Sequence, residues 1–340
     1  MSETQRKKWI DLVKCIAIFV VMLNHSLLDL PGVKFWGGMF FVPVFFVLSG
    51  FTYRSREESF WSFLGRKAKR LLLPYIGAGG VLFAFFAWKH VCLSGGEFAD
   101  MYYDFGGLFY ARNQIFSWET PTLFLAEARD NIYLLGCLNS PTWFLPALFL
   151  TIVAFEVLYR WSKQDGKKML LAAMILLCIA NLYHYLFPVL LPWSLDAVPY
   201  FLVFFLWGYF MARKDWIAWF DKRLWVLLLL GAVFVLFALW NGSANYSVGN
   251  YGKSATMALY NGVVSSTLLM YICSKVNRWI PKCFTWPGRQ SMWILCFHLF
   301  VFEIVKTVIP GVHPALMILL TAAVLTAVGA GKERWLHGKR

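Results

Sequence analysis

The feature that most constrains this chain is a series of ten apolar stretches. Each is long enough to cross the ~30 Å hydrocarbon layer of a membrane as a helix, some with help from tilt or flanking residues. In lipid a backbone must satisfy its own hydrogen bonds, so such stretches fold as helices. We therefore predict an all-α, polytopic transmembrane helix bundle. The expected spans are residues 9–28, 36–53, 71–91, 143–160, 168–187, 195–212, 223–240, 256–275, 291–309 and 315–331.

Composition agrees with this interpretation. The 340 residues are 59% hydrophobic and only 15% charged, which excludes an ordinary soluble domain. Lys and Arg fall mainly in one set of alternate connecting segments, which holds 25 of them, whereas the opposite set holds 4. Cytoplasmic segments carry such an excess, so both termini are predicted to be cytoplasmic. The same bias explains the net charge of +14, and we expect no nucleic-acid partner.

The longest connecting segment covers about residues 93–142 on the predicted outer side, and it is acidic and aromatic. A structureless loop of this length is uncommon. We therefore expect the segment to contain short or re-entrant helices that pack on the outer end of the helix bundle. A carbohydrate-binding lid and a plain surface cover both remain open as its role. We expect one transmembrane domain over 1–340, with no fused soluble transferase domain, and the oligomeric state is left open.

Two ionisable residues lie in the first apolar stretch. Lys14 and His25 are eleven residues apart, which puts them on one helix face with about 16 Å between them along the axis. Ionisable groups inside a membrane-spanning helix usually face a protein interior or a wet cavity, so both are candidate functional residues. A histidine in this position can act as a general base. Two structural alternatives stay open: an Asp11–Lys14 pair, and a His25 that only bonds a neighbouring helix.

Six short sequence motifs follow one another between residues 8 and 300. They are Lys14-x10-His25, FFVLSGF from Phe45 to Phe51, Lys67-x-x-Arg70, Trp143-Phe144-Leu145, LPWSLDAVPYFLVFFLWGYF at 191–210, and SMWILCFHLF with Ser291 and His298. In this order they resemble the acyltransferase family 3 membrane proteins, in particular the sugar O-acetylase branch. That family has Arg where this chain has Lys67, so the match is loose there. The resemblance implies a bacterial inner-membrane protein of the cell envelope.

The resemblance also implies an activity. Such proteins move an acyl group, here most simply acetyl, from cytoplasmic acyl-CoA to a hydroxyl of a cell-surface or lipid-linked carbohydrate. The acyl donor is then a co-substrate, the bilayer and the glycan are the partners, and no metal is expected. An acyl-CoA carries phosphate charges that suit cytoplasmic cations, and the residues expected to bind it are Arg66, Lys67, Arg70 and Lys14. For Arg66, a charge that only sets the topology is an equal alternative.

The remaining roles follow from the chemistry of acyl transfer. His25 is expected to take the proton of the acceptor hydroxyl, with an acyl-His25 intermediate left open. Asn24, Ser49 and Trp143 are candidate donors to the thioester oxygen, and Ser49, Trp143 and Asp196 are candidates for substrate binding. His298 is a weaker catalytic candidate, since a structural hydrogen bond would also explain it. For Asp196, capping of the following helix by Ser194 or Asp196 is an equal alternative.

Two other classes of function remain. A transporter or flippase could use the buried Lys and His for substrate passage, but the sequence shows no internal repeat that would support one. An acyl-export component would instead pass the acyl group to a separate enzyme. We therefore expect an acyltransferase, with thiol release from acyl-CoA as the measurement that separates these classes.

Overall fold

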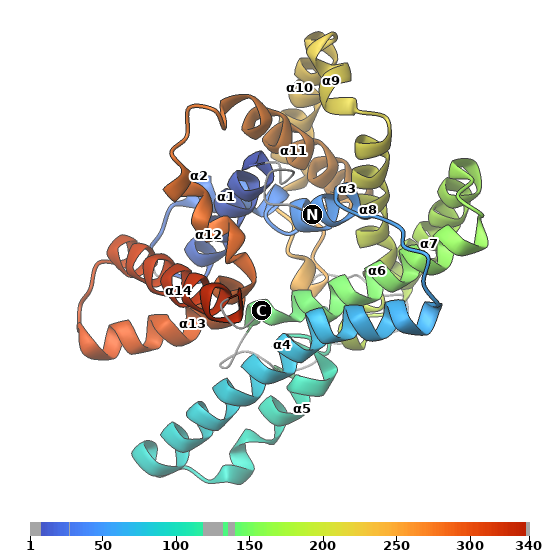
Figure 1. Ribbon diagram of the computed structural model, residues 1–340. Helices are drawn as coiled ribbons and strands as arrows, with labels where there is room; N and C mark the ends of the chain where they lie inside the picture. Colours follow the sequence, from blue (N-terminus) through green and yellow to red (C-terminus); the bar gives the residue numbers. More distant parts are fainter. Residues whose placement is uncertain (1–7, 27, 118–131, 135–139, 338–340) are drawn as a thin grey trace. The chain divides into compact units, whose positions relative to one another are not determined.

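The computed structural model (Figure 1) describes residues 8–26, 28–117, 132–134 and 140–337. These residues form helices joined by turns, with isolated β-bridges and no extended strand among them. Within this described part, nine helical segments are long and apolar enough to cross a membrane. The first helix, Lys8–Asn24, has 17 residues, one fewer than the 18 required of a candidate span. The predicted all-α membrane fold is therefore confirmed, while its orientation stays a prediction.

The chain forms two compact units, which are described separately. Unit 1 comprises Met1–Phe45, Ile217–Leu236 and Asn261–Arg340, and unit 2 comprises Phe46–Trp216 and Phe237–Tyr260. Both units draw on segments far apart in the sequence. The expectation of one transmembrane domain over 1–340 stays a prediction.

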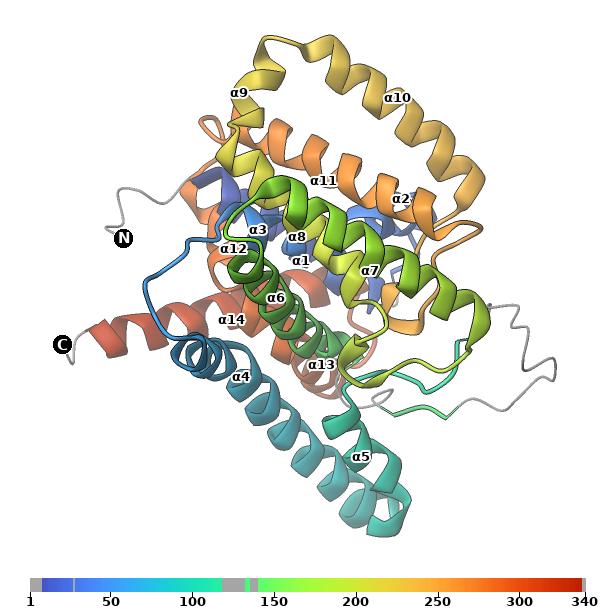
Figure 2. The same ribbon diagram turned by 90° about the vertical axis from the view of Figure 1, so that its right-hand side faces the viewer.

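Unit 1 is built from helices at both ends of the chain. It contains α1 (Lys8–Asn24), α2 (Pro31–Phe40), α12 (Trp286–Arg289), α13 (Ser291–Val308) and α14 (Pro314–His337). It also takes most of α9 (Trp216–Asp221), α10 (Leu224–Asn241) and α11 (Ala255–Val276). The consecutive helices α13 and α14 lie side by side, as Figures 1 and 2 both show. The N-terminal α1 packs against α2, α12 and α13, so it is the central helix of this unit.

Unit 2 holds the middle of the chain. It contains most of α3 (Pro43–Phe51), with α4 (Phe60–Trp88), α5 (Tyr102–Tyr110), α6 (Phe144–Trp161), α7 (Gly166–Leu186) and α8 (Val198–Arg213). Its core is aromatic: Phe46 stacks on Phe201 with ring centroids 4.3 Å apart, and Phe155 lies 4.5 Å from Phe205. Because these rings come from α3, α6 and α8, the three helices pack around one aromatic core.

The helix boundaries differ most from the predicted spans at 9–28, 36–53 and 71–91, and α14 continues to His337, past the predicted end at residue 331. The stretch 36–53 is two helices, α2 and α3, and the second begins at Pro43, a residue that suits a first helical turn. The helix expected at 71–91 begins at Phe60 because the Ser59 side chain caps it, accepting a hydrogen bond from Ser62 N at 3.2 Å. In the stretch 9–28, the helix α1 already ends at Asn24.

The long connecting segment contains the predicted short helix, α5, which packs beside α4 (Figure 2). Tyr75 of α4 donates its hydroxyl hydrogen to the carbonyl oxygen of Leu108 at 2.8 Å. After α5 the chain pairs with the segment around residue 190: Leu190 N donates to Ile115 O and Ser117 N donates to Pro188 O. Residues 118–131 and 135–139 lie outside the described residues, so the proposed lid or cover is untested.

Candidate active site

Two histidines from opposite ends of the chain meet in unit 1. His25 follows the last residue of α1, and its backbone N–H still donates to Val21 O at 3.3 Å, which keeps it in the helical turn. His298 lies on α13 and its side chain is completely buried. The centroids of the two imidazole rings are 5.5 Å apart, with a 53° angle between the ring planes. The structure thus brings together two of the predicted catalytic residues.

The hydrogen bonds of His298 determine which ring nitrogen carries hydrogen. Nδ1 lies 2.8 Å from the carbonyl oxygen of Ile294 and 3.1 Å from that of Leu295. Carbonyl oxygens only accept hydrogen bonds, so Nδ1 is the donor, and in the neutral ring Nε2 is then an acceptor. Nε2 is buried and has no hydrogen-bond partner. His298 therefore has both a structural bond to its own helix and an unused acceptor atom.

Local packing explains why α1 is held firmly in unit 1. A Cβ atom at Gly288 of α12 would overlap the carbonyl oxygen of Asp11, so only glycine allows this close approach. The next residue, Arg289, places its Nε 3.5 Å from a carboxylate oxygen of Asp11, whose side chain is buried. Asp11 is thus compensated by a charge from another helix, while the alternative of an Asp11–Lys14 pair stays open.

The two other candidates on α1 are Lys14 and Asn24. Lys14 is partly buried and lies three turns before His25, as the spacing predicts. The side-chain amide of Asn24 donates to Val20 O at 2.9 Å, so one of its two N–H groups is used within its own helix. The second N–H group is the one that Asn24 could offer to a substrate oxygen.

The predicted donor-binding cations lie on α4 in unit 2. Arg66 forms an ion pair with Glu58, and its guanidinium also lies 5.5 Å from the Phe63 ring centroid. The ammonium of Lys67 lies 5.4 Å from the same centroid, and Arg70 is exposed. The Arg66 guanidinium holds the pKa of Glu58 below its usual range. Arg66 is therefore already engaged, which leaves Lys67 and Arg70 as the more available cations for a phosphate group.

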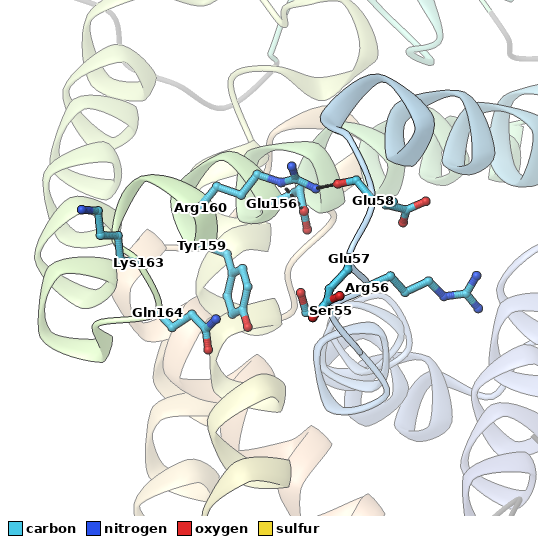
Figure 3. A pocket seen from close by; sticks show the side chains of 9 residues that line it. All are labelled: Ser55, Arg56, Glu57, Glu58, Glu156, Tyr159, Arg160, Lys163 and Gln164. Atoms are coloured by element: carbon cyan, nitrogen blue, oxygen red, sulfur yellow. Dashed lines mark hydrogen bonds and ion pairs between the residues drawn. The ribbon is translucent and has the colours of Figure 1, made fainter.

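A pocket of about 330 Å³ lies beside this cluster in unit 2 (Figure 3). Its lining comes from the α3–α4 connection and the end of α6: Ser55, Arg56, Glu57, Glu58, Glu156, Tyr159, Arg160, Lys163 and Gln164. Two of its acids have partners, since Glu156 accepts from Arg160 Nε at 2.6 Å and from Tyr53, and Glu58 pairs with Arg66. The shared residue Glu58 connects the pocket with the cations of α4.

The glycine of the FFVLSGF motif, Gly50, lies at a close crossing of two helices in unit 2. A Cβ atom at Gly50 of α3 would overlap the carbonyl oxygen of Phe205, and one at Gly208 of α8 would overlap that of Val47. The two glycines thus let the backbones of α3 and α8 touch. Ser49, a substrate-binding candidate, directly precedes this contact and is partly buried.

The remaining candidates, Trp143 and Asp196, also lie in unit 2. Trp143 is buried directly before α6, with its ring centroid 6.1 Å from that of Phe201. Asp196 accepts a hydrogen bond from Leu191 N at 3.0 Å and forms an ion pair at 2.9 Å with Arg112, which is fully buried. The alternative that Ser194 or Asp196 caps α8 is wrong, because the N-cap is Ala197 and no side chain caps that helix.

Arg112 is a residue that sequence reasoning missed. It is one of only four basic residues in the predicted outer segments, where it contributes to the charge balance. The only sequence feature that distinguishes Arg112 is that it is a cation in segments with few cations. It did not indicate burial, because burial depends on segments distant in the sequence.

The fold defines an integral membrane protein whose helices bury several polar side chains, His298 among them. The family model of the acyltransferase domain matches residues 7–331, nearly the whole chain. The chain therefore belongs to acyltransferase family 3, and it is a membrane acyltransferase. Neither a comparison with curated proteins nor one with solved structures finds a match.

Proposed function

We propose that this acyltransferase moves an acyl group, most simply acetyl, from cytoplasmic acyl-CoA to a hydroxyl of a cell-surface or lipid-linked carbohydrate, with His25 as general base. The observation that carries the proposal is the His25–His298 pair in a chain of this family. Neutral imidazole is a suitable base near pH 7, and an alcohol needs one to attack a thioester.

The pair supports a division of roles. The unused Nε2 of His298 can accept the N–H of His25, directly or through one water, and this fixes the tautomer of His25. The other nitrogen of His25 then has a lone pair for the proton of the acceptor hydroxyl. The hydroxyl oxygen attacks the thioester carbonyl, the C–S bond breaks, and CoA leaves as the thiol after taking a proton. An N–H of Asn24 is available for the oxyanion.

The donor side rests on charge. Acyl-CoA carries several phosphate charges and its nucleotide must stay in the cytoplasm, the side on which the positive-inside rule predicts the cations of α4. Lys67 and Arg70 are assigned to the phosphates, with Arg66 held by Glu58 at the edge of the neighbouring pocket. Lys14 is assigned to the donor as well, near the cytoplasmic end of α1.

The experiment that tests this function is acceptor-dependent thiol release. Purified protein in lipid nanodiscs is incubated with acetyl-CoA and a panel of glycosides, and free CoA thiol is followed together with acetyl ester on the sugar. The proposal predicts thiol release that rises with acceptor and matches ester formation. Movement of sugar across vesicles without thiol release would instead indicate a transporter, and thiol release without any ester would indicate acyl export.

A further inference from the structure

An unusual concentration of unpartnered polar atoms lies in two short segments of unit 2. Ten buried side-chain nitrogen and oxygen atoms of the described residues lack a hydrogen-bond partner, and four of them are here. They are Nε and Nη1 of Arg112, Oδ1 of Asn113 and Oγ of Ser194. Because a buried polar group left without a partner costs free energy, such a cluster calls for an occupant.

An ion pair joins the two segments. Nη2 of Arg112 lies 2.9 Å from Oδ2 of Asp196, and the Arg112 side chain is 0% exposed. Asp196 thus uses only one edge of the guanidinium, and the other donors have no protein acceptor. Arginine is never neutral in proteins, so the unused donors cannot be removed by deprotonation. They need oxygen acceptors from a ligand or from trapped water.

Hydrogen bonds join the two segments that carry these atoms. Leu190 N donates to Ile115 O at 2.7 Å, Ser117 N donates to Pro188 O at 2.8 Å, and the Trp193 indole N–H donates to Phe109 O at 2.7 Å. Three hydrogen bonds therefore hold the segment around residue 112 against the segment around residue 190. The backbone segments that carry the unpartnered atoms are thus fixed against each other.

The same cluster contacts the segments that contain Asp196 and Trp143, two of the residues predicted to bind substrate. Arg112 binds Asp196, and the neighbouring Asn113 donates its Nδ2 hydrogen to Ser140 Oγ at 3.1 Å. Ser140 opens the short 3-10 helix Ser140–Trp143 that leads into α6. Asp196 and Trp143, chosen on separate grounds, are thus linked through two consecutive residues.

We propose that Arg112, Asn113 and Ser194, with Asp196 as the counter-ion of Arg112, form a subsite for hydroxyl groups of the acceptor. The guanidinium donates, the Asn113 oxygen accepts and the Ser194 hydroxyl does both, which matches neighbouring hydroxyls on a sugar ring. Since the ion pair has no net charge, the subsite favours a neutral polyhydroxyl ligand over an anionic one. This inference rests on the proposed function, because the ligand is the acceptor of that reaction.

Binding of simple glycosides tests the subsite without any acyl donor. The probes are methyl glycosides of glucose, galactose and N-acetylglucosamine, with methyl glucuronide as the anion and glycerol as the small polyol from which lipid head groups are built. The variants are Ser194→Ala, which removes one unpartnered hydroxyl, and Arg112→Lys, which keeps the charge. Ser266→Ala is the matched control, because Ser266 is equally buried, also unpartnered and located in unit 1.

The readout is the saturable rise of the unfolding midpoint with probe concentration. We expect a neutral glycoside to bind the wild type, Ser194→Ala to weaken it about tenfold, Arg112→Lys to weaken it further, and Ser266→Ala to leave it unchanged. Equal affinity in Ser194→Ala and wild type would mean that only water fills the site, and would overturn the proposal even if Arg112→Lys failed to fold. Absence of saturable binding, tighter binding of the glucuronide, or equal binding of glycerol would also overturn it.

This binding assay separates the subsite from the proposed function. Glycoside binding that depends on Ser194, without thiol release from acetyl-CoA, would contradict the acyl-transfer proposal alone. Acceptor-dependent thiol release with binding unaffected by Ser194→Ala would contradict the subsite alone.

Discussion

The imidazole ring of His298 lies 5.5 Å from that of His25, centroid to centroid, although one residue is near the start of the chain and the other near its end. His298 is held by two carbonyl oxygens of its own helix, and its free Nε2 is buried. An unpartnered acceptor inside a membrane protein is costly, and a bond from His25 to this atom, as proposed above, would offset that cost.

The first prediction concerns His298 as a positioning residue. His298→Ala should lower kcat for acyl transfer about 10- to 100-fold with little change in the KM for acetyl-CoA, because it removes the group that fixes the tautomer of His25. His298→Gln keeps an amide near the position of Nε2 and should recover part of the loss. Steady-state kinetics of the three proteins checks this. A His298→Ala variant that folds and keeps full kcat would remove His298 from the mechanism.

The second prediction concerns the crossing of α3 and α8. Gly50→Ala should destabilise the protein by about 3 kcal/mol or more, because the new methyl group meets the carbonyl oxygen of Phe205 and the two backbones must separate. Gly80→Ala on α4 is the control, since a Cβ there meets nothing within 4 Å. That control should be neutral or stabilising by about 0.5–1 kcal/mol. Thermal unfolding in detergent measures both, and equal midpoints would contradict the close crossing.

The third prediction concerns the donor site. Arg70→Ala should raise the KM for acetyl-CoA about 10-fold without changing the acceptor KM, because it removes an exposed cation assigned to the donor phosphates. Arg223→Ala provides a control cation that lies against Trp219 and has no assigned role. Donor titrations at saturating acceptor give the comparison. If both variants keep the wild-type donor KM, Arg70 does not bind CoA.

Much of the fold could be predicted because membrane helices are local. Length and hydropathy alone located the helices, and the boundary errors have local causes, such as the Ser59 cap that starts α4 well before residue 71. The break between α2 and α3 has a local signal as well, Pro43, the first residue of α3. Sequence patterns of this kind predict which residues form helices, but they do not define which helices pack together.

The site was predictable only in part, for the same reason. His25 was found from its position in an apolar helix, and the motif order added His298, but no pattern indicated that their rings would meet. Arg112 was hidden because its burial depends on Asp196 and on the segment around residue 190. Contacts between distant segments are set by packing, and a single sequence contains no direct record of them.

The most direct test of the account is the rate of acetyl transfer by a His25→Ala variant. His313→Ala is the matched control, because His313 lies in the turn between α13 and α14, where its ring nitrogen accepts from Ala315 N at 3.3 Å. Thiol release from acetyl-CoA and acetyl ester on the sugar are measured for both variants and for the wild type, with equal folding checked by thermal unfolding. The account predicts that His25→Ala loses about 10²- to 10⁴-fold in kcat while His313→Ala keeps it. Full acceptor-dependent transfer by a folded His25→Ala variant would contradict it.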